Sequence, residues 1–307
     1  MKINPVRIKL HTRLSLAVAL ALVVSLSACV NTKSATSTAP TSSAAPNAML
    51  LTRERIAEIV ASPDRSAADK NTDIRRKPDQ MLAFIGVRPG MLALDLSTGG
   101  GYSTELLARA VGPTGRVYGQ SPPPRAPDSP PRPAVTPEGN AAPAASAAAG
   151  ATMAPAPVRR TSPQALAERA KNPVVANIFS VVQAFEDPVP PALAAGGLDL
   201  VTLMFNYHDL GHMGVDRARM NKAVFAGLKP GAIYVIADHS GRPGTGISEA
   251  GTLHRIEEAF LRREVESAGF KFVDQGNFLR NPADPRDKNT PEPAQPKDQF
   301  VLKFVKP

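Results

Sequence analysis

The chain has 307 residues, a formal net charge of +9 and only 5% aromatic residues, with no tryptophan. This length suits one α/β domain of ordinary size, whose core must consist mainly of aliphatic side chains. Lysine and arginine are interleaved with acidic residues and form no basic block, so no nucleic-acid partner is expected. The single cysteine, Cys29, excludes a disulfide framework within one chain.

Residues 1–28 have the pattern of a signal peptide. Residues 1–13 carry four basic side chains and no acidic one, and an apolar run follows over 14–26. This run is shorter than the roughly 20 residues that cross a bilayer, and the small residues after it are typical of a cleavage site. An uncleaved anchor is the alternative. Removal of the segment leaves +5 of the +9 charges.

The tetrad Leu26-Ser27-Ala28-Cys29 resembles a bacterial lipobox. The resemblance implies that Cys29 becomes the lipidated first residue of the mature protein. The residue after this cysteine is Val30 and not aspartate, which in lipoproteins of this kind points to the outer membrane. Residues 29–50 are rich in Ser, Thr, Ala and Pro, and we expect a disordered tether there. The expected location is the cell envelope, lipid-anchored at the periplasmic face of the outer membrane.

The folded domain is expected over residues 51–307, and its first half alternates helix and strand signals. Thr52 precedes an amphipathic stretch, Pro78 opens a second one, and a continuous apolar run predicts a buried strand. A glycine-rich loop over 97–102 follows that strand. The predicted elements are helices over 53–62, 78–85 and 103–111 and strands over 91–96 and 116–119.

Residues 121–160 interrupt this alternation. They include 11 prolines and a long alanine-rich run without apolar periodicity. We expect a disordered insertion in a surface loop; a functional proline-rich ligand is the alternative. The pattern then resumes with helices from residue 162 and over 217–227 and 253–268, and with strands over 178–184, 198–205, 232–237, 270–273 and 299–304. The sequence predicts an α/β fold, a Rossmann-like doubly wound sheet that is mostly parallel with an antiparallel closing strand.

The segment around the glycine loop has the features of a nucleotide-binding corner. A strand ends near an acid, a glycine loop follows, and a helix begins directly after it. The spacing differs from the G-x-G-x-x-G of NAD enzymes. The run D-L-S-T-G-G-G, from Asp95 to Gly101, resembles instead the D-x-G-x-G-x-G motif of class I S-adenosylmethionine (SAM) dependent methyltransferases, with Ser97 at the first glycine position.

A second resemblance runs along most of the domain. The segments GGGY, NYHD, DHS, LHRI and LRNPAD resemble a family of exported bacterial proteins predicted to be class I methyltransferases. The match covers roughly 73–119 and 174–307. It implies a class I methyltransferase fold with SAM as cofactor.

The resemblance also implies where the cofactor would bind. The loop would surround the methionyl part, and an acid after the third strand would contact the adenine amine. Gln120 stands where an acid usually holds the ribose hydroxyls, and it carries no charge. The cofactor residues implied are Asp95, Ser97, Gly99, Gly101, Tyr102, Gln120, Glu186 and Asp187.

Asn206, Tyr207, His208 and Asp209 follow the fourth strand, where the resemblance implies groups that face the methyl acceptor. Methyl transfer needs mainly in-line positioning. His208 is the candidate general base because its unperturbed pKa lies near about 6.5, and Asp209 would orient it. The alternative is that these residues only tie the loop to neighbouring backbone. The expected acceptor is a small or lipid-like molecule.

His208 and His212 are four residues apart, a spacing that puts two metal ligands on one face of a helix. Asp238 or His239 would be a third ligand. Because Gly211 disfavours a helix and the zinc-protease glutamate is missing, we expect no metal. Three functions stay open: a SAM-dependent methyltransferase, a non-catalytic envelope lipoprotein that binds a ligand or partner, and a metal-dependent hydrolase.

Overall fold

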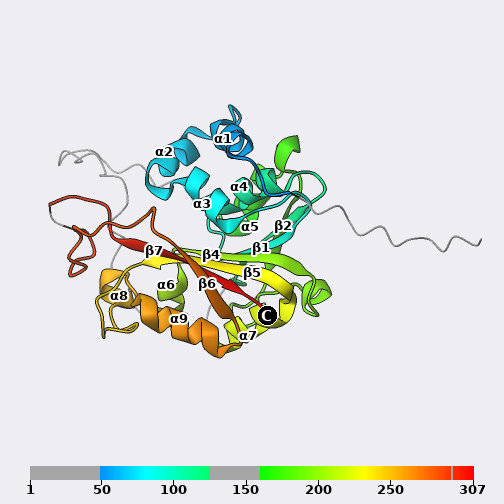
Figure 1. The fold of residues 1–307 in the computed structure, drawn as a ribbon. Coiled ribbons are helices and arrows are strands. Elements are labelled where there is room, and N and C mark those ends of the chain that lie inside the picture. The colour runs from blue at the N-terminus through cyan, green and yellow to red at the C-terminus, as the bar shows by residue number, and fades with distance from the viewer. Residues whose placement is uncertain (1–48, 125–159, 292) are drawn as a thin grey trace, which may run out of the picture. The chain divides into compact units, whose positions relative to one another are not determined.

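The computed structural model describes residues 49–124, 160–291 and 293–307 (Figure 1). Seven strands form one sheet in the order β3-β2-β1-β4-β5-β7-β6. Strand β7 is antiparallel to both of its neighbours, and β1 to β5 are parallel to one another. The predicted Rossmann-like sheet with an antiparallel closing strand is therefore confirmed. The strands are β1 Leu92–Leu96, β2 Arg116–Ser121, β3 Ile178–Val182, β4 Leu198–Met204, β5 Leu228–His239, β6 Lys271–Gly276 and β7 Gln299–Val305.

Helices cover both faces of this sheet, with α1 to α5 on one face and α6 to α9 on the other (Figure 1). Two short 3-10 turns lie at Pro173–Val175 and Pro191–Leu193. The helices are α1 Arg53–Ala61, α2 Ala67–Arg76, α3 Pro78–Ile85, α4 Tyr102–Val111, α5 Ser162–Arg169, α6 Tyr207–His212, α7 Arg217–Gly227, α8 Ala250–Leu253 and α9 Glu258–Ser267.

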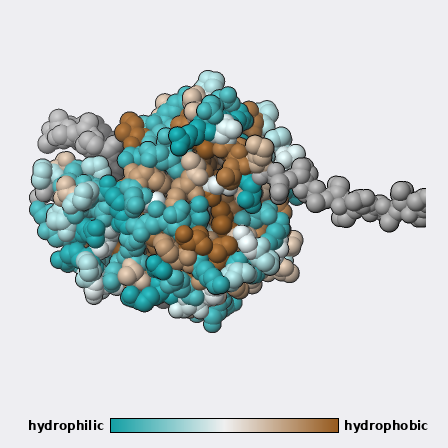
Figure 2. All heavy atoms as spheres, viewed as in Figure 1, coloured by the Kyte–Doolittle hydropathy of each residue, from teal (hydrophilic) through white to brown (hydrophobic). Residues whose placement is uncertain are grey.

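Two apolar cores lie on opposite faces of the sheet, and successive strand residues contribute to them in turn. Ala93 and Leu200 belong to the core under α1 to α5, whereas Leu94 and Val201 belong to the core over α6 to α9. This follows from the period-two alternation of strand side chains, and it explains why the central strands β1 and β4 are mostly apolar on both faces. Hydrophilic residues dominate the face seen in Figure 2, where apolar ones gather near the middle.

Capping residues explain several helix starts. Thr52 accepts a hydrogen bond from the backbone of Arg55 and so begins α1 where the sequence predicts it. Thr161 and Gln164 form a reciprocal capping box at α5. The predicted helix over 217–227 is found with these bounds, after Asp216 as N-cap.

Three helical regions differ from the prediction. Helix α2 was not predicted, because its sequence AADKNTDIRR has no apolar stripe and only Asp69 is buried. The single helix predicted over 253–268 is wrong, since His254 has a left-handed φ of 50° that separates α8 from α9. Residues 207–212 form α6 despite Gly211. A Cβ on that glycine would lie 2.1 Å from the terminal methyl carbon of Ile247, so that side chain would have to move to admit a larger residue.

Some predictions fall on residues that the structure does not describe. The signal peptide, Cys29 and most of the tether lie within 1–48, and most of the insertion lies within 125–159. Among the described residues, no helix combines the length and apolarity needed to span a bilayer.

Candidate functional site

The loop after β1 alternates into the left-handed backbone region. Ser97, Gly99 and Gly101 have φ angles of 55°, 52° and 81°. These are the three positions that glycine occupies in the motif the sequence resembles, and glycine is the residue that adopts this region without strain. A Cβ on Gly99 would meet nothing within 4 Å, whereas one on Gly101 would lie 2.7 Å from the Leu166 side chain. The loop is therefore open at Gly99 and tightly packed at Gly101.

Asp95 lies beneath this loop and is fully buried. Its carboxylate accepts hydrogen bonds of 2.7 Å from the hydroxyls of Ser103, Thr104 and Thr202. Burial raises the pKa of Asp95, and the three hydroxyls oppose that shift. The side chain thus joins β1 to α4 and β4, and it does not line the cavity described below.

Gln120 is also fully buried, and both ends of its amide are engaged. Its Oε1 accepts from the backbone N–H of Ser97 at 3.1 Å, and its Nε2 donates to the carbonyl of Gln183 at 2.7 Å. Gln120 therefore connects the ends of β1, β2 and β3. In this arrangement it offers no group to the ribose of a nucleotide.

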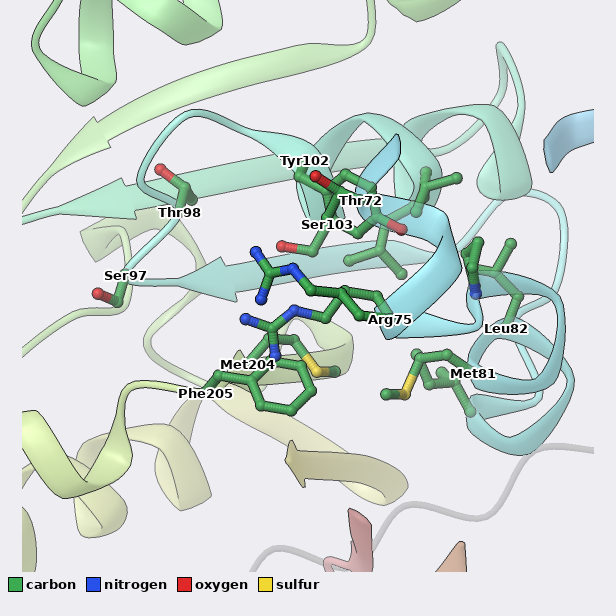
Figure 3. A pocket seen from close by; sticks show the side chains of 15 residues that line it. Thr72, Arg75, Met81, Leu82, Ser97, Thr98, Tyr102, Ser103, Met204 and Phe205 are labelled. Carbon is green, nitrogen blue, oxygen red and sulfur yellow. The ribbon is translucent and has the colours of Figure 1, made fainter. Parts of the chain in front are cut away.

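A cavity of about 260 Å³ lies between the glycine loop and helices α2 and α3 (Figure 3). Its size is close to the lower end of the range for small-molecule sites. Figure 3 shows Arg75 reaching from α2 toward the loop that carries Ser97 and Thr98. Its lining includes Arg75, Arg76, Thr98, Tyr102, Met204 and Phe205.

Two aromatic residues of this cavity are held by α2. The Tyr102 hydroxyl donates to Asp73 at 2.7 Å, and the guanidinium of Arg76 lies 3.3 Å from the ring centroid of Phe205. Phe205 itself has a left-handed φ of 60°, which is strained for a bulky residue. Sequence reasoning missed this side of the cavity. The signal was the Arg75-Arg76 pair just before the predicted helix at Pro78.

Neither of the two acids after β3, Glu186 and Asp187, lines this cavity. Glu186 lines a second, shallow hollow together with residues 122–124 and Met213. Asp187 is exposed, whereas nearby Phe185 is buried in the core. Of the two, Glu186 is the one positioned beside a concave surface.

Asn206 connects the glycine loop with α6. Its Oδ1 accepts from the Ser97 hydroxyl at 2.5 Å, and its Nδ2 donates to Asp209 Oδ2 at 2.8 Å. Tyr207 instead lies in the core, where its hydroxyl accepts from Asn221 and donates to Glu264. Asn206 and Asp209 therefore lie beside the glycine loop at the carboxyl end of β4, and Tyr207 is a packing residue.

His208 lies at the centre of a buried polar cluster and is only 1% exposed. Its Nδ1 is 2.6 Å from Asp238 Oδ1, and its Nε2 is 3.2 Å from both His254 Nδ1 and Asp209 Oδ1. Burial opposes protonation, but Asp238 and Asp209 outweigh it and raise the pKa of His208 to about 10. His208 then holds its proton at neutral pH, which argues against the predicted role as general base.

The pair His208 and His212 is not formed, although both residues lie on α6. The His212 ring packs against the backbone of Gly251, where a Cβ would lie 2.2 Å from Nδ1. His239 hydrogen-bonds to Gln299 at 3.1 Å. The histidine that joins His208 is His254, which lies 46 residues further along the chain.

Buried ion pairing fixes the backbone next to His254. Arg255 is fully buried, and its guanidinium makes two hydrogen bonds to Asp284 at 2.8 and 3.1 Å. It also donates to the carbonyls of Ser240 and Lys288. Arg255 thus joins the segments DHS, LHRI and LRNPAD to one another beside the His208 cluster.

No protein-family model and no curated relative matches the chain. Solved structures do resemble it in fold. A SAM-dependent methyltransferase from Aquifex aeolicus is 16% identical, with 84% of this chain and 100% of that chain covered and a TM-score of 0.49. The [4+2]-cyclase SpnF is 15% identical over 78% and 81%, with a TM-score of 0.48. Fibrillarin from Aeropyrum pernix, crystallised with bound SAM, is 16% identical over 71% and 67%, with a TM-score of 0.39.

Proposed function

We propose that the protein is a SAM-dependent methyltransferase that acts on a small or lipid-like acceptor in the bacterial cell envelope. The observation that carries the proposal is the backbone of the loop after β1. Its three motif positions all adopt the left-handed region, and the loop borders a cavity of about 260 Å³. A loop of this kind lets a ligand approach the backbone closely.

Arg75 supplies a charge that suits the cofactor. The side chain lines the cavity and, within the described ranges, makes no hydrogen bond or ion pair. The methionyl end of SAM carries a carboxylate, and a guanidinium binds carboxylates through paired hydrogen bonds. We infer that Arg75 binds this carboxylate while Tyr102 and Phe205 enclose the apolar part of the ligand.

The acceptor would bind at the carboxyl ends of β4 and β5. Asn206 and Asp209 lie there, and Asn206 is hydrogen-bonded to Ser97 of the glycine loop. Rigid placement of cofactor and acceptor can supply much of the rate enhancement of a methyl transfer. Three of the residues with left-handed non-glycine backbones, Ser97, Phe205 and His254, also lie in this region. Such strain tends to gather at functional sites.

Lipidation at Cys29 would hold the enzyme at the membrane, on the periplasmic face of the outer membrane. The basis is the lipobox-like tetrad at residues 26–29. A Cys29→Ser substitution should move the protein from the membrane fraction to the soluble fraction of a bacterial lysate. Retention of the variant in the membrane fraction would contradict lipid anchoring.

The proposed activity is tested by titrating the full-length protein with SAM and with S-adenosylhomocysteine by calorimetry, in excess EDTA. We expect binding of both ligands. Arg75→Ala should weaken it about tenfold or more, because a hydrogen bond to a charged group contributes about 1.5–3 kcal/mol. Arg263→Ala, on the exposed surface of α9, is the matched control and should bind as the wild type does. Absence of binding in the wild type would refute the proposal.

Gln120 favours a second candidate, a non-catalytic envelope lipoprotein that uses the same fold to bind another ligand or partner. Its amide is committed to Ser97 and Gln183, at the place where an acid would hold the ribose of SAM. A wild-type protein that binds neither nucleoside in the calorimeter, yet stays folded, would support this candidate.

A further inference from the structure

Three potential ligand atoms of the His208 cluster form a nearly equilateral triangle. Nε2 of His208, Nδ1 of His254 and Oδ1 of Asp209 are 3.2 Å apart along all three edges. A tetrahedral ion with bonds of about 2.0–2.1 Å sets neighbouring ligand atoms about 3.3 Å apart. The triangle therefore has the dimensions of a three-residue metal site.

We propose that His208, Asp209 and His254 bind a divalent transition metal ion of the zinc class, with Asp238 as a positioning residue for His208. The inference does not rest on methyl transfer, because it uses only the geometry of these four side chains. It replaces the pairing of His208 with His212 that the sequence spacing suggested. It also reverses the expectation that the protein has no metal site.

The hydrogen bond to Asp238 sets the tautomer that a metal needs. An ion that binds here displaces the Nε2 proton of His208. With Nδ1–H still donated to Asp238 Oδ1 at 2.6 Å, Nε2 then presents a lone pair toward Asp209 and His254. A carboxylate behind a metal-binding histidine is the usual arrangement, and it also increases the basicity of the ligand. Asp238 is itself held by the backbone N–H groups of His208 and His239.

The other two ligands are held with similar rigidity. Asn206 donates to Asp209 Oδ2, which leaves Oδ1 directed at the two imidazoles. His254 stands in a left-handed junction between α8 and α9, and the next residue, Arg255, is clamped by Asp284. A site whose ligands are locked by surrounding hydrogen bonds loses little conformational entropy when an ion binds.

The donor set selects the class of metal. Two imidazole nitrogens and one carboxylate suit Zn²⁺ and its neighbours in the first transition row, whereas Mg²⁺ and Ca²⁺ prefer oxygen ligands throughout. Three protein ligands leave a position for water or for an oxygen of a bound molecule. The Asp209 side chain is 26% exposed, so it is the member of the site that solvent reaches.

The test is calorimetric titration of the EDTA-stripped, full-length protein with Zn²⁺ alone. We expect one ion per chain with a Kd of about 1 μM or tighter. His254→Asn should weaken this binding by about 100-fold, since it removes a ligand while asparagine tolerates the left-handed backbone. Asp238→Asn should weaken it about 10- to 100-fold. His212→Asn, on the same helix as His208, should leave it unchanged.

Circular dichroism melts of each variant establish that the variants are folded, and Co²⁺ gives a second readout. Bound Co²⁺ should show visible d–d absorption that is lost in His254→Asn and kept in His212→Asn. The proposal is overturned if the wild type binds no Zn²⁺ at about 100 μM. It is equally overturned if His254→Asn binds as the wild type does, which would place the ion elsewhere, or if Mg²⁺ binds in preference. Failure here leaves the SAM titration in EDTA unaffected.

Discussion

Asp95 and Asp238 lie in β1 and β5, the two strands that flank β4, and both are fully buried. Their partners differ in kind. Asp95 accepts from three neutral hydroxyls, each at 2.7 Å. Asp238 accepts from two backbone N–H groups and from the imidazole of His208. The same residue type at comparable places in the sheet therefore serves two different purposes.

The difference shows how the electrostatic character of each corner is set. Hydroxyls stabilise a carboxylate only in part, so burial prevails and raises the pKa of Asp95. An adjacent imidazole can instead take up a proton, and Asp238 with Asp209 raises the pKa of His208 to about 10. The β1 corner is a hydrogen-bonded polar group beneath the glycine loop, whereas the β5 corner holds a charged pair.

Removal of Asp238 should have the largest effect on stability. Asp238→Ala leaves the His208 imidazolium without its buried partner, and breaking such a pair costs about 3–5 kcal/mol. Urea denaturation in the presence of EDTA measures this loss. The exposed Asp274→Ala, on β6, is the control and should change the free energy of unfolding by no more than about 0.5 kcal/mol. A loss below about 1 kcal/mol for Asp238→Ala would mean that the pair is not charged.

Asp95→Asn should have a smaller effect that depends on pH. At acidic pH it should cost about 1–2 kcal/mol, because the amide NH₂ faces a hydroxyl donor. The raised folded pKa means that wild-type stability is fully present below the ordinary value of 3.8 and is lost as pH rises through the folded pKa. The cost of the substitution should therefore shrink as pH increases, in urea titrations at a series of pH values. A cost that grows with pH would show that the hydroxyls outweigh burial.

The strands and most helices could be predicted because their signals are local. Continuous apolar runs, capping residues such as Thr52 and turns before strands fix these elements without knowledge of the rest of the chain. Helix α2 could not be predicted in this way, because it is held by ion pairs such as Arg65 with Asp73 and Arg169 with Asp69. Arg169 lies 100 residues from Asp69, and no periodicity reveals either pair.

The site was predicted only in part for the same reason. The glycine loop and the residues after β4 each follow directly on a predicted strand, so the sequence alone predicts that they lie at the carboxyl ends of these strands. One partner of His208, His254, is 46 residues away, and the packing of α6 against α8 brings the two together. The spacing of His208 and His212 was a local signal that tertiary packing overrides, because the His212 ring packs against Gly251.

The smallest expected effect concerns Ser97, whose hydroxyl joins the β1 corner to Asn206 and through it to Asp209. Ser97→Ala loses this hydrogen bond and keeps a side chain at a φ of 55°, whereas Ser97→Gly loses the bond but relieves the backbone. Ser97→Gly should therefore be more stable than Ser97→Ala by about 1 kcal/mol in urea denaturation, the usual cost of a left-handed residue with a Cβ. Because the bond is shared by both corners, each variant should also weaken Zn²⁺ binding slightly and by the same factor. If only Ser97→Ala weakened it, backbone strain and not the Asn206 bond would couple the two corners.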